Sequence, residues 1–191
     1  MARPKTGDKP RDIRDATVGE VAAIGSTSVS VNKIAKRAGL SVGTLYRYHK
    51  SKHALLSWVF LEVKRDIHNA MMGAADTLEG AAARLQAMWF ALVDYGLRAP
   101  EDFLFVEMVS AEVREPSPED EEIGRIQGEV LAEIRAGIDE GVLVEAPVTT
   151  VETILASPAI TLVRHASLSG TRPERGELEL VFKLIWRGLS A

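Results

Sequence analysis

The chain contains no cysteine, and this absence narrows the chemistry open to it. With no Cys among its 191 residues, neither a disulfide framework nor a thiolate metal site can form. No stretch approaches the roughly 18 consecutive apolar residues that a membrane-spanning helix needs. The first twelve residues are polar and basic and hold no apolar segment of the kind found in secretory signals. We therefore expect a cytoplasmic protein that does not bind a membrane.

Sequence signals of enzyme chemistry are also missing. There is no glycine-rich phosphate loop, no nucleophile elbow and no ordered nucleophile, histidine and acid. The acidic run at 119–122 lies at the start of a predicted helix, where carboxylates are favoured by the helix dipole. His49 and His53 are four residues apart, but a new helix is predicted to begin between them, so they do not share a face. We expect no enzyme activity, no metal site and no cofactor.

Charge is distributed unevenly along the chain. Residues 1–53 hold eleven Lys and Arg against four Asp and Glu, a net charge of +7, whereas residues 54–191 hold 12 against 23, a net charge of −11. A basic N-terminal segment on an acidic body indicates a polyanionic partner for that segment only. A lysine-rich solvated tail would give the same pattern, so charge alone leaves both interpretations open.

Apolar residues recur at helical spacing throughout, and no segment has a convincing strand pattern, so the predicted fold class is all-α. We expect helices at about 9–24, 31–38, 42–49 and 52–75, a fifth between a junction at 76–80 and Pro100, and then 101–113, 118–140, 150–169 and 174–189. Pro158 should kink the eighth of these helices. The predicted N-caps are Asp8, Ser30, Ser51, Ser117 and Thr149, the last in a capping box with Glu152.

Residues 31–50, VNKIAKRAGLSVGTLYRYHK, have the pattern of a helix-turn-helix. Ala35 is small where two short helices must cross, and Gly39 can adopt the left-handed conformation that the turn needs. Ile34, Ala38, Leu40 and Leu45 would hold the second helix on the first. No acid occurs between Leu40 and Lys52, and the exposed face of the second helix offers donors to phosphates and base edges: Ser41, Thr44, Tyr46, Arg47, Tyr48 and Lys50.

The stretch IAKRAGLSVGTLYRYHKSKHALL resembles the N-terminal DNA-binding domain of the TetR family of transcriptional regulators. This resemblance covers about 25 residues closely, and the number of helices extends it loosely to the whole chain. It implies an N-terminal three-helix helix-turn-helix head at 1–53, with the motif at about 31–50, and a six-helix body at 54–191 for effector binding and dimerisation. In the head, it implies phosphate contacts by Tyr46, Tyr48, Lys50 and Lys52 and base contacts by Val42, Gly43, Thr44 and Arg47; Ser30 and Ser41 complete the candidate DNA-binding set.

Two positions of the head depart from the family pattern. His49 stands where the family has a buried aromatic residue. The first helix carries Val21-Ala22 and Gly25-Ser26 in place of the family's Leu-Phe pair and its glycine-aromatic ending.

The resemblance further implies a small-molecule effector pocket inside the body and a homodimer through the last two helices. The candidate pocket residues are Trp89, Phe90, Val93, Phe103, Phe105, Met108 and His165, although apolar stripes of this kind are usually plain core. The ninth predicted helix is apolar over more than one face, so we expect it to pack on the eighth and on its dimer mate, or else to be buried in its own subunit. The candidate interface residues are Leu162, Leu178, Val181, Phe182, Ile185 and Trp186.

The predicted function is that of a sequence-specific regulator, a repressor that a small, largely apolar effector releases from a double-stranded DNA operator. One alternative is an all-α ligand- or protein-binding module whose head no longer reads DNA. A small helical enzyme is the other, and the missing catalytic residues argue against it.

Overall fold

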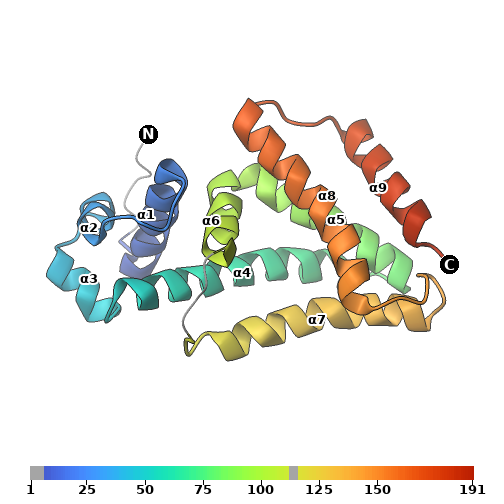
Figure 1. The fold of residues 1–191 in the computed structure, drawn as a ribbon, viewed down its shortest axis with the longest axis horizontal. Coiled ribbons are helices and arrows are strands. Elements are labelled where there is room, and N and C mark those ends of the chain that lie inside the picture. Colours follow the sequence, from blue (N-terminus) through green and yellow to red (C-terminus); the bar gives the residue numbers. More distant parts are fainter. Residues whose placement is uncertain (1–6, 112–115) are drawn as a thin grey trace. The chain divides into compact units, whose positions relative to one another are not determined.

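A computed structural model describes residues 7–111 and 116–191 (Figure 1). Over these residues the fold is all-α, as predicted, and the only β feature is an isolated bridge between Leu143 and Ser190. The helices are α1 (Lys9–Ile24), α2 (Val31–Ala38), α3 (Val42–Tyr48), α4 (Lys52–Ala75), α5 (Ala81–Arg98), α6 (Pro100–Ala111), α7 (Asp120–Asp139), α8 (Val148–Ser169) and α9 (Arg175–Leu189).

The ends of α1 and the start of α4 follow the predicted capping chemistry. The carboxylate of Asp8 accepts a hydrogen bond from the backbone N–H of Arg11, and Gly25 ends α1 with a left-handed φ of 70°. The hydroxyl oxygen of Ser51 accepts from the N–H of Ala54 at 3.0 Å. The predicted end of the sixth helix at Val113 lies outside the described residues.

Ser30 is the N-cap of α2, as predicted, although its side chain makes no capping hydrogen bond. The two other predicted caps are wrong. Ser117 lies in a turn, where its N–H and hydroxyl donate to Asp120, so α7 begins only at that residue. Pro147 starts α8 two residues early with a φ of −56°, which places Thr149 inside the helix.

The partner expected for that capping box is also engaged elsewhere, since Glu152 accepts a hydrogen bond from Gln127. α8 continues through Pro158 to Ser169.

The chain forms two compact units. The first comprises residues 1–64 and 101–123, and the second comprises 65–100 and 124–191. The units do not coincide with the predicted boundary between residues 53 and 54. α4 runs without interruption across that point, and α6 belongs almost entirely to the first unit.

Two interactions hold the first unit together around α1. Apolar side chains of α1, including Ile13 and Val21, are fully buried. Arg14 donates to both carboxylate oxygens of Asp102 on α6, at 2.8 and 3.3 Å, and both side chains are largely buried. A bidentate guanidinium–carboxylate pair of this kind fixes orientation as well as distance, so α6 is tied to the helix that supports the helix-turn-helix.

The core of the second unit is a cluster of aliphatic side chains from α5, α7, α8, α9 and the connection after α7: Leu85, Ile134, Ile138, Leu143, Val151, Leu155 and Leu189. The indole N–H of Trp89 donates to the backbone oxygen of Leu155 at 3.0 Å, which satisfies the one polar atom of this buried ring. Packing is close at Gly137, because a Cβ there would lie 2.9 Å from Leu143 Cδ1 and 3.1 Å from Leu85 Cδ1, so these side-chain ends would have to shift.

Candidate nucleic-acid interface

The turn between α2 and α3 is built as the sequence predicts. Gly39 ends α2 with φ 71° and ψ 31°, a left-handed conformation that a side chain would strain. Its N–H donates to the carbonyl of Lys36 at 3.1 Å, and the next N–H, that of Leu40, donates back to Ala35 at 2.9 Å. This arrangement satisfies the last carbonyls of α2 and redirects the chain at once into α3.

Apolar side chains fix α3 against α2. Leu45 is the buried side chain of α3, and α2 buries Ile34, Ala35 and Ala38. Because α3 is only seven residues long, burial of one leucine on one side leaves most of its surface facing outward.

Ser41 caps α3 and organises its first turn. Its hydroxyl oxygen accepts from the N–H of Thr44 at 3.0 Å and lies 2.8 Å from the Thr44 hydroxyl oxygen. Ser41 and Thr44 are therefore structural as well as surface residues, and they orient the end of α3 that carries Val42 and Gly43.

The outward surface of α3 and the residues that follow it is polar, aromatic and positively charged. Tyr46 and Tyr48 are 46% and 45% exposed, which is unusual for large aromatic side chains. Arg47 and Lys50 are exposed, and Lys52 is half-buried in the first turn of α4. None of these three cations forms an ion pair with any residue that the structure describes.

All ten predicted DNA-binding residues lie at the surface. Ser30, Ser41 and Gly43 are exposed, and Val42 and Thr44 are half-buried. An added Cβ at Gly43 would meet only the Ser41 hydroxyl oxygen, at 3.9 Å. The fold itself therefore does not require a glycine at this position.

His49 is the C-cap of α3 and replaces the family's aromatic residue in packing. Its ring lies on the indole of Trp58 in α4, with ring centroids 4.7 Å apart and a tilt of 35°. Burial lowers the pKa of His49, and the carboxylate of Glu119 acts against this shift. Burial thus favours the neutral form of the ring.

Arg37 is a residue whose role the sequence did not reveal. Its guanidinium lies directly over Gly19 of α1, where there is no room for a Cβ, and Nη1 is 3.3 Å from Glu20 Oε1. This contact joins α2 to α1, and α1 is the helix that lacks the family's aromatic residues. In the sequence, the only indication of this contact is that Gly19 lies at helical spacing from residues on the buried face of α1.

The predicted effector residues divide between the two units. Trp89, Phe90 and Val93 are buried in α5, Phe103 and Phe105 are buried in α6, and Met108 is half-buried. The expectation of a buried or pocket histidine at His165 is not met. Its side chain is exposed because Val163 and Ala166 occupy the inward side of α8.

The predicted interface residues of α9 mostly face their own subunit. Leu178 and Phe182 are buried within the second unit, so they are already covered without a second copy. Val181, Ile185, Trp186 and, on α8, Leu162 are half-buried. The large apolar side chains left exposed on α9 are instead Leu180 and Leu184, which are 56% and 60% exposed.

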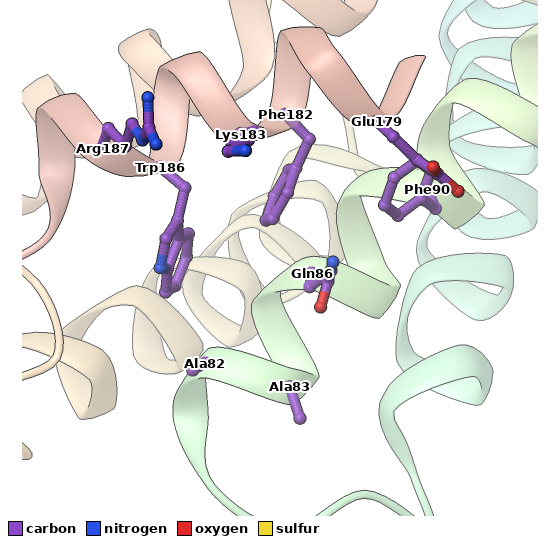
Figure 2. A pocket seen from close by; sticks show the side chains of 9 residues that line it. All are labelled: Ala82, Ala83, Gln86, Phe90, Glu179, Phe182, Lys183, Trp186 and Arg187. Carbon is purple, nitrogen blue, oxygen red and sulfur yellow. The ribbon is translucent and has the colours of Figure 1, made fainter. Parts of the chain in front are cut away.

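A groove of about 600 Å³ lies between α5 and α9 in the second unit (Figure 2). Phe182 and Trp186 extend from α9 toward α5, and Ala82, Ala83 and Gln86 line the opposite side (Figure 2). Of the predicted effector residues, only Phe90 borders this groove. The other lining residues are Glu179, Lys183 and Arg187.

Two further features are absent from the described residues. No three His, Cys, Asp or Glu side chains there come together in a way that could hold a metal ion. None of the helices in the same part of the chain combines the length and apolar character needed to cross a bilayer.

Comparison with known proteins agrees with this geometry. Residues 13–58 match the sequence model of bacterial regulatory proteins of the tetR family. The chain is 32% identical over 90 residues to the HTH-type transcriptional regulator BetI of Klebsiella pneumoniae, a match that covers 44% of this chain and 46% of that protein. The matched segment thus spans just under half the length of this curated relative.

Solved structures extend the likeness over the whole fold. A TetR family transcription regulator from Marinobacter aquaeolei has a TM-score of 0.86 at 27% identity, over 95% of both chains. A regulator of the same description from Shewanella has a TM-score of 0.82 at 24% identity, over 96% of this chain and 98% of the other, and this likeness concerns the fold alone. The chain thus resembles TetR family transcription regulators both in the sequence of residues 13–58 and in the fold of its described residues.

Proposed function

We propose that this protein binds an operator in double-stranded DNA as a homodimer and represses transcription until a small-molecule effector releases it. The observation that carries the proposal is the outward surface of α3 and the residues that follow it, where Arg47, Lys50 and Lys52 form no ion pair with described residues and two tyrosines are exposed. Cations without protein partners are available to neutralise phosphates and release counterions, which is the main source of affinity for DNA.

In the proposed complex, α3 enters the major groove. Arg47 and the start of the helix, at Val42 to Thr44, face base edges, while Tyr46, Tyr48, Lys50 and Lys52 contact phosphates. The two heads of a dimer would bind half-sites about one helical turn of DNA apart, roughly 34–36 Å.

Exposed apolar side chains on α8 and α9 support the proposed dimer. Leu180 and Leu184 are one turn apart on α9, and Leu168 on α8 is 76% exposed. Leucines exposed to this degree in neighbouring helices indicate a surface that another chain covers. The relevant residues are therefore those on the outer side of α9, rather than Leu178 and Phe182.

The dimer is tested by sedimentation of the Leu180→Glu/Leu184→Glu variant. We expect the wild type to sediment as a dimer and the variant as a monomer. Leu78→Glu is the matched control, because Leu78 is a partly exposed leucine outside α8 and α9. A variant that remains dimeric at micromolar concentration would exclude this face as the interface.

The proposed release is a two-state mechanism. The effector binds the body better in a pose of the dimer in which the heads are wrongly spaced for the operator, and it shifts the equilibrium only by its differential affinity for the two poses. α4 is the natural lever, because this continuous helix belongs to both compact units.

DNA recognition is tested by fluorescence anisotropy with fragments of the DNA that flanks the gene, against scrambled fragments of the same composition. We expect a preference for one fragment, and we expect Arg47→Ala to weaken that preference by about 1–3 kcal/mol. Arg135→Ala, at an exposed position of α7, is the control and should bind like the wild type. Equal affinity for all fragments would favour the alternative, a ligand- or protein-binding module.

A further inference from the structure

The groove between α5 and α9 combines an aromatic wall with positive charge. Phe90, Phe182 and Trp186 form a continuous aromatic series, with centroid distances of 5.6 Å between the two phenylalanines and 5.5 Å between Phe182 and Trp186 (Figure 2). Ala82 and Ala83 on the α5 side are too small to fill the facing space. A flat or aliphatic group fits between these surfaces, and the volume of about 600 Å³ lies within the range of small-molecule sites.

The charge of the groove is positive. Lys183 and Arg187 line it from α9, one helical turn apart, and neither forms an ion pair with a described residue. The one acid of the lining, Glu179, is paired with Arg175 at 2.9 Å. This excess of two cations is a local exception in a body whose residues 54–191 carry a net charge of −11. An anion is therefore the complementary ligand.

The aromatic wall of the groove is separate from the proposed dimer face, whereas Lys183 and Arg187 lie on the same side of α9 as Leu180 and Leu184 and border that face. At 3.6 residues per turn, Phe182 and Trp186 project from nearly the opposite side of α9 to Leu180 and Leu184. A second copy seated on the two leucines leaves the aromatic wall accessible.

We propose that the groove between α5 and α9 binds a small amphipathic organic anion. Its apolar body packs on Phe182 and Trp186 and its carboxylate or sulfonate group pairs with Lys183 and Arg187. The role of the groove as the effector site rests on the proposed function. The proposal that the groove binds a ligand rests only on its geometry and charge.

Isothermal titration calorimetry of the full chain with three probes tests the proposal. Naphthalene-2-sulfonate has both the apolar body and the anion, naphthalen-2-ylmethanol has only the body, and inorganic sulfate has only the anion. We expect naphthalene-2-sulfonate to bind at least about fivefold more tightly than either of the others, since each supplies half of the complementary chemistry. Equal affinity for the alcohol and the sulfonate would overturn the proposal.

Three variants locate the binding. Lys183→Gln/Arg187→Gln changes only exposed side chains and should weaken sulfonate binding about fivefold or more, whereas Arg135→Gln, an exposed cation on α7, should leave it within about twofold. Ala83→Phe fills the groove from an exposed helical position and should abolish binding without lowering the thermal midpoint. Unchanged affinity in the double variant overturns the proposal.

DNA affinity measured on the same samples separates this inference from the proposed function. Intact DNA binding with no sulfonate binding refutes the groove alone. Sulfonate binding with no sequence-selective DNA binding refutes the proposed function and leaves the groove as a ligand site. If both hold and saturating sulfonate lowers DNA affinity, the groove is the effector site; unchanged DNA affinity removes that role.

Discussion

Replacing Gly43 by alanine separates what the fold needs at the start of α3 from what DNA needs there. Gly43 is exposed, its φ is not positive, and the nearest atom to an added Cβ is the Ser41 hydroxyl oxygen at 3.9 Å, an ordinary van der Waals distance. The free chain therefore accepts a methyl group at this position without moving any neighbour.

The expected change in stability is a small gain. Alanine is favoured over glycine in a helix interior by about 1 kcal/mol, and less in a first turn, so the thermal midpoint should stay the same or rise by about 1–3 °C for a chain of this size. The expected change in DNA affinity has the opposite sign. A methyl group where α3 meets base edges misplaces the contacts to about one base pair in each half-site, at a cost of about 1–3 kcal/mol per half-site, so operator affinity should fall at least about tenfold.

The assay pairs a thermal melt with an anisotropy titration for Gly43→Ala and for Gly124→Ala. Gly124 is an exposed glycine in α7, and a Cβ there meets nothing within 4 Å. Because Gly124 lies beyond the first turn of α7, the control should show a gain in stability at least as large, with wild-type DNA affinity. Loss of stability in Gly43→Ala would refute the local geometry, and retained DNA affinity would refute the placement of Gly43 against DNA.

Three further predictions concern the support of the head. Ser41→Ala removes the cap of α3 and should lower the free energy of unfolding by about 1 kcal/mol in denaturant titrations; an unchanged midpoint would contradict the role of the cap. Arg14→Met leaves Asp102 without its guanidinium partner and should cost about 3 kcal/mol, while the control Arg135→Met should cost almost nothing. The folded chain holds the pKa of His49 below its usual 6.5, so the unfolded chain takes up this proton first as pH falls. The contribution of His49 to stability is therefore present above pH 6.5 and lost below it, and His49→Phe should flatten the fall of the thermal midpoint between about pH 7 and pH 5; a profile identical to the wild type would exclude His49 as its source.

The sequence predicted the helix-turn-helix in detail because its determinants are local. The left-handed turn at Gly39 and the buried leucine at Leu45 each depend on residues within a few positions of one another. The same locality explains the correct limits of α1 and α2. The caps of α7 and α8 were wrong because competing local interactions, the fixed φ of Pro147 and the hydrogen bonds of Ser117 to Asp120, displaced both helix starts.

The rest of the site depends on contacts between residues far apart in the sequence. Arg37 over Gly19, Arg14 with Asp102 and His49 on Trp58 all join separate helices, and nothing in their own segments marks them. The body was predicted least well, because an all-round apolar helix does not show which side is inward. Only packing reveals that α9 turns Phe182 inward and Leu184 outward.

The central claim, that Lys50 and Lys52 neutralise phosphates in a DNA complex, is tested most directly by the salt dependence of operator affinity. Each phosphate contact contributes about 0.9 to the slope of log affinity against log salt concentration. Lys50→Gln/Lys52→Gln removes two contacts per subunit, so the slope for the dimer should become shallower by about 3 to 4. The control Arg135→Gln should keep the wild-type slope. A double variant whose slope equals that of the wild type would contradict the account.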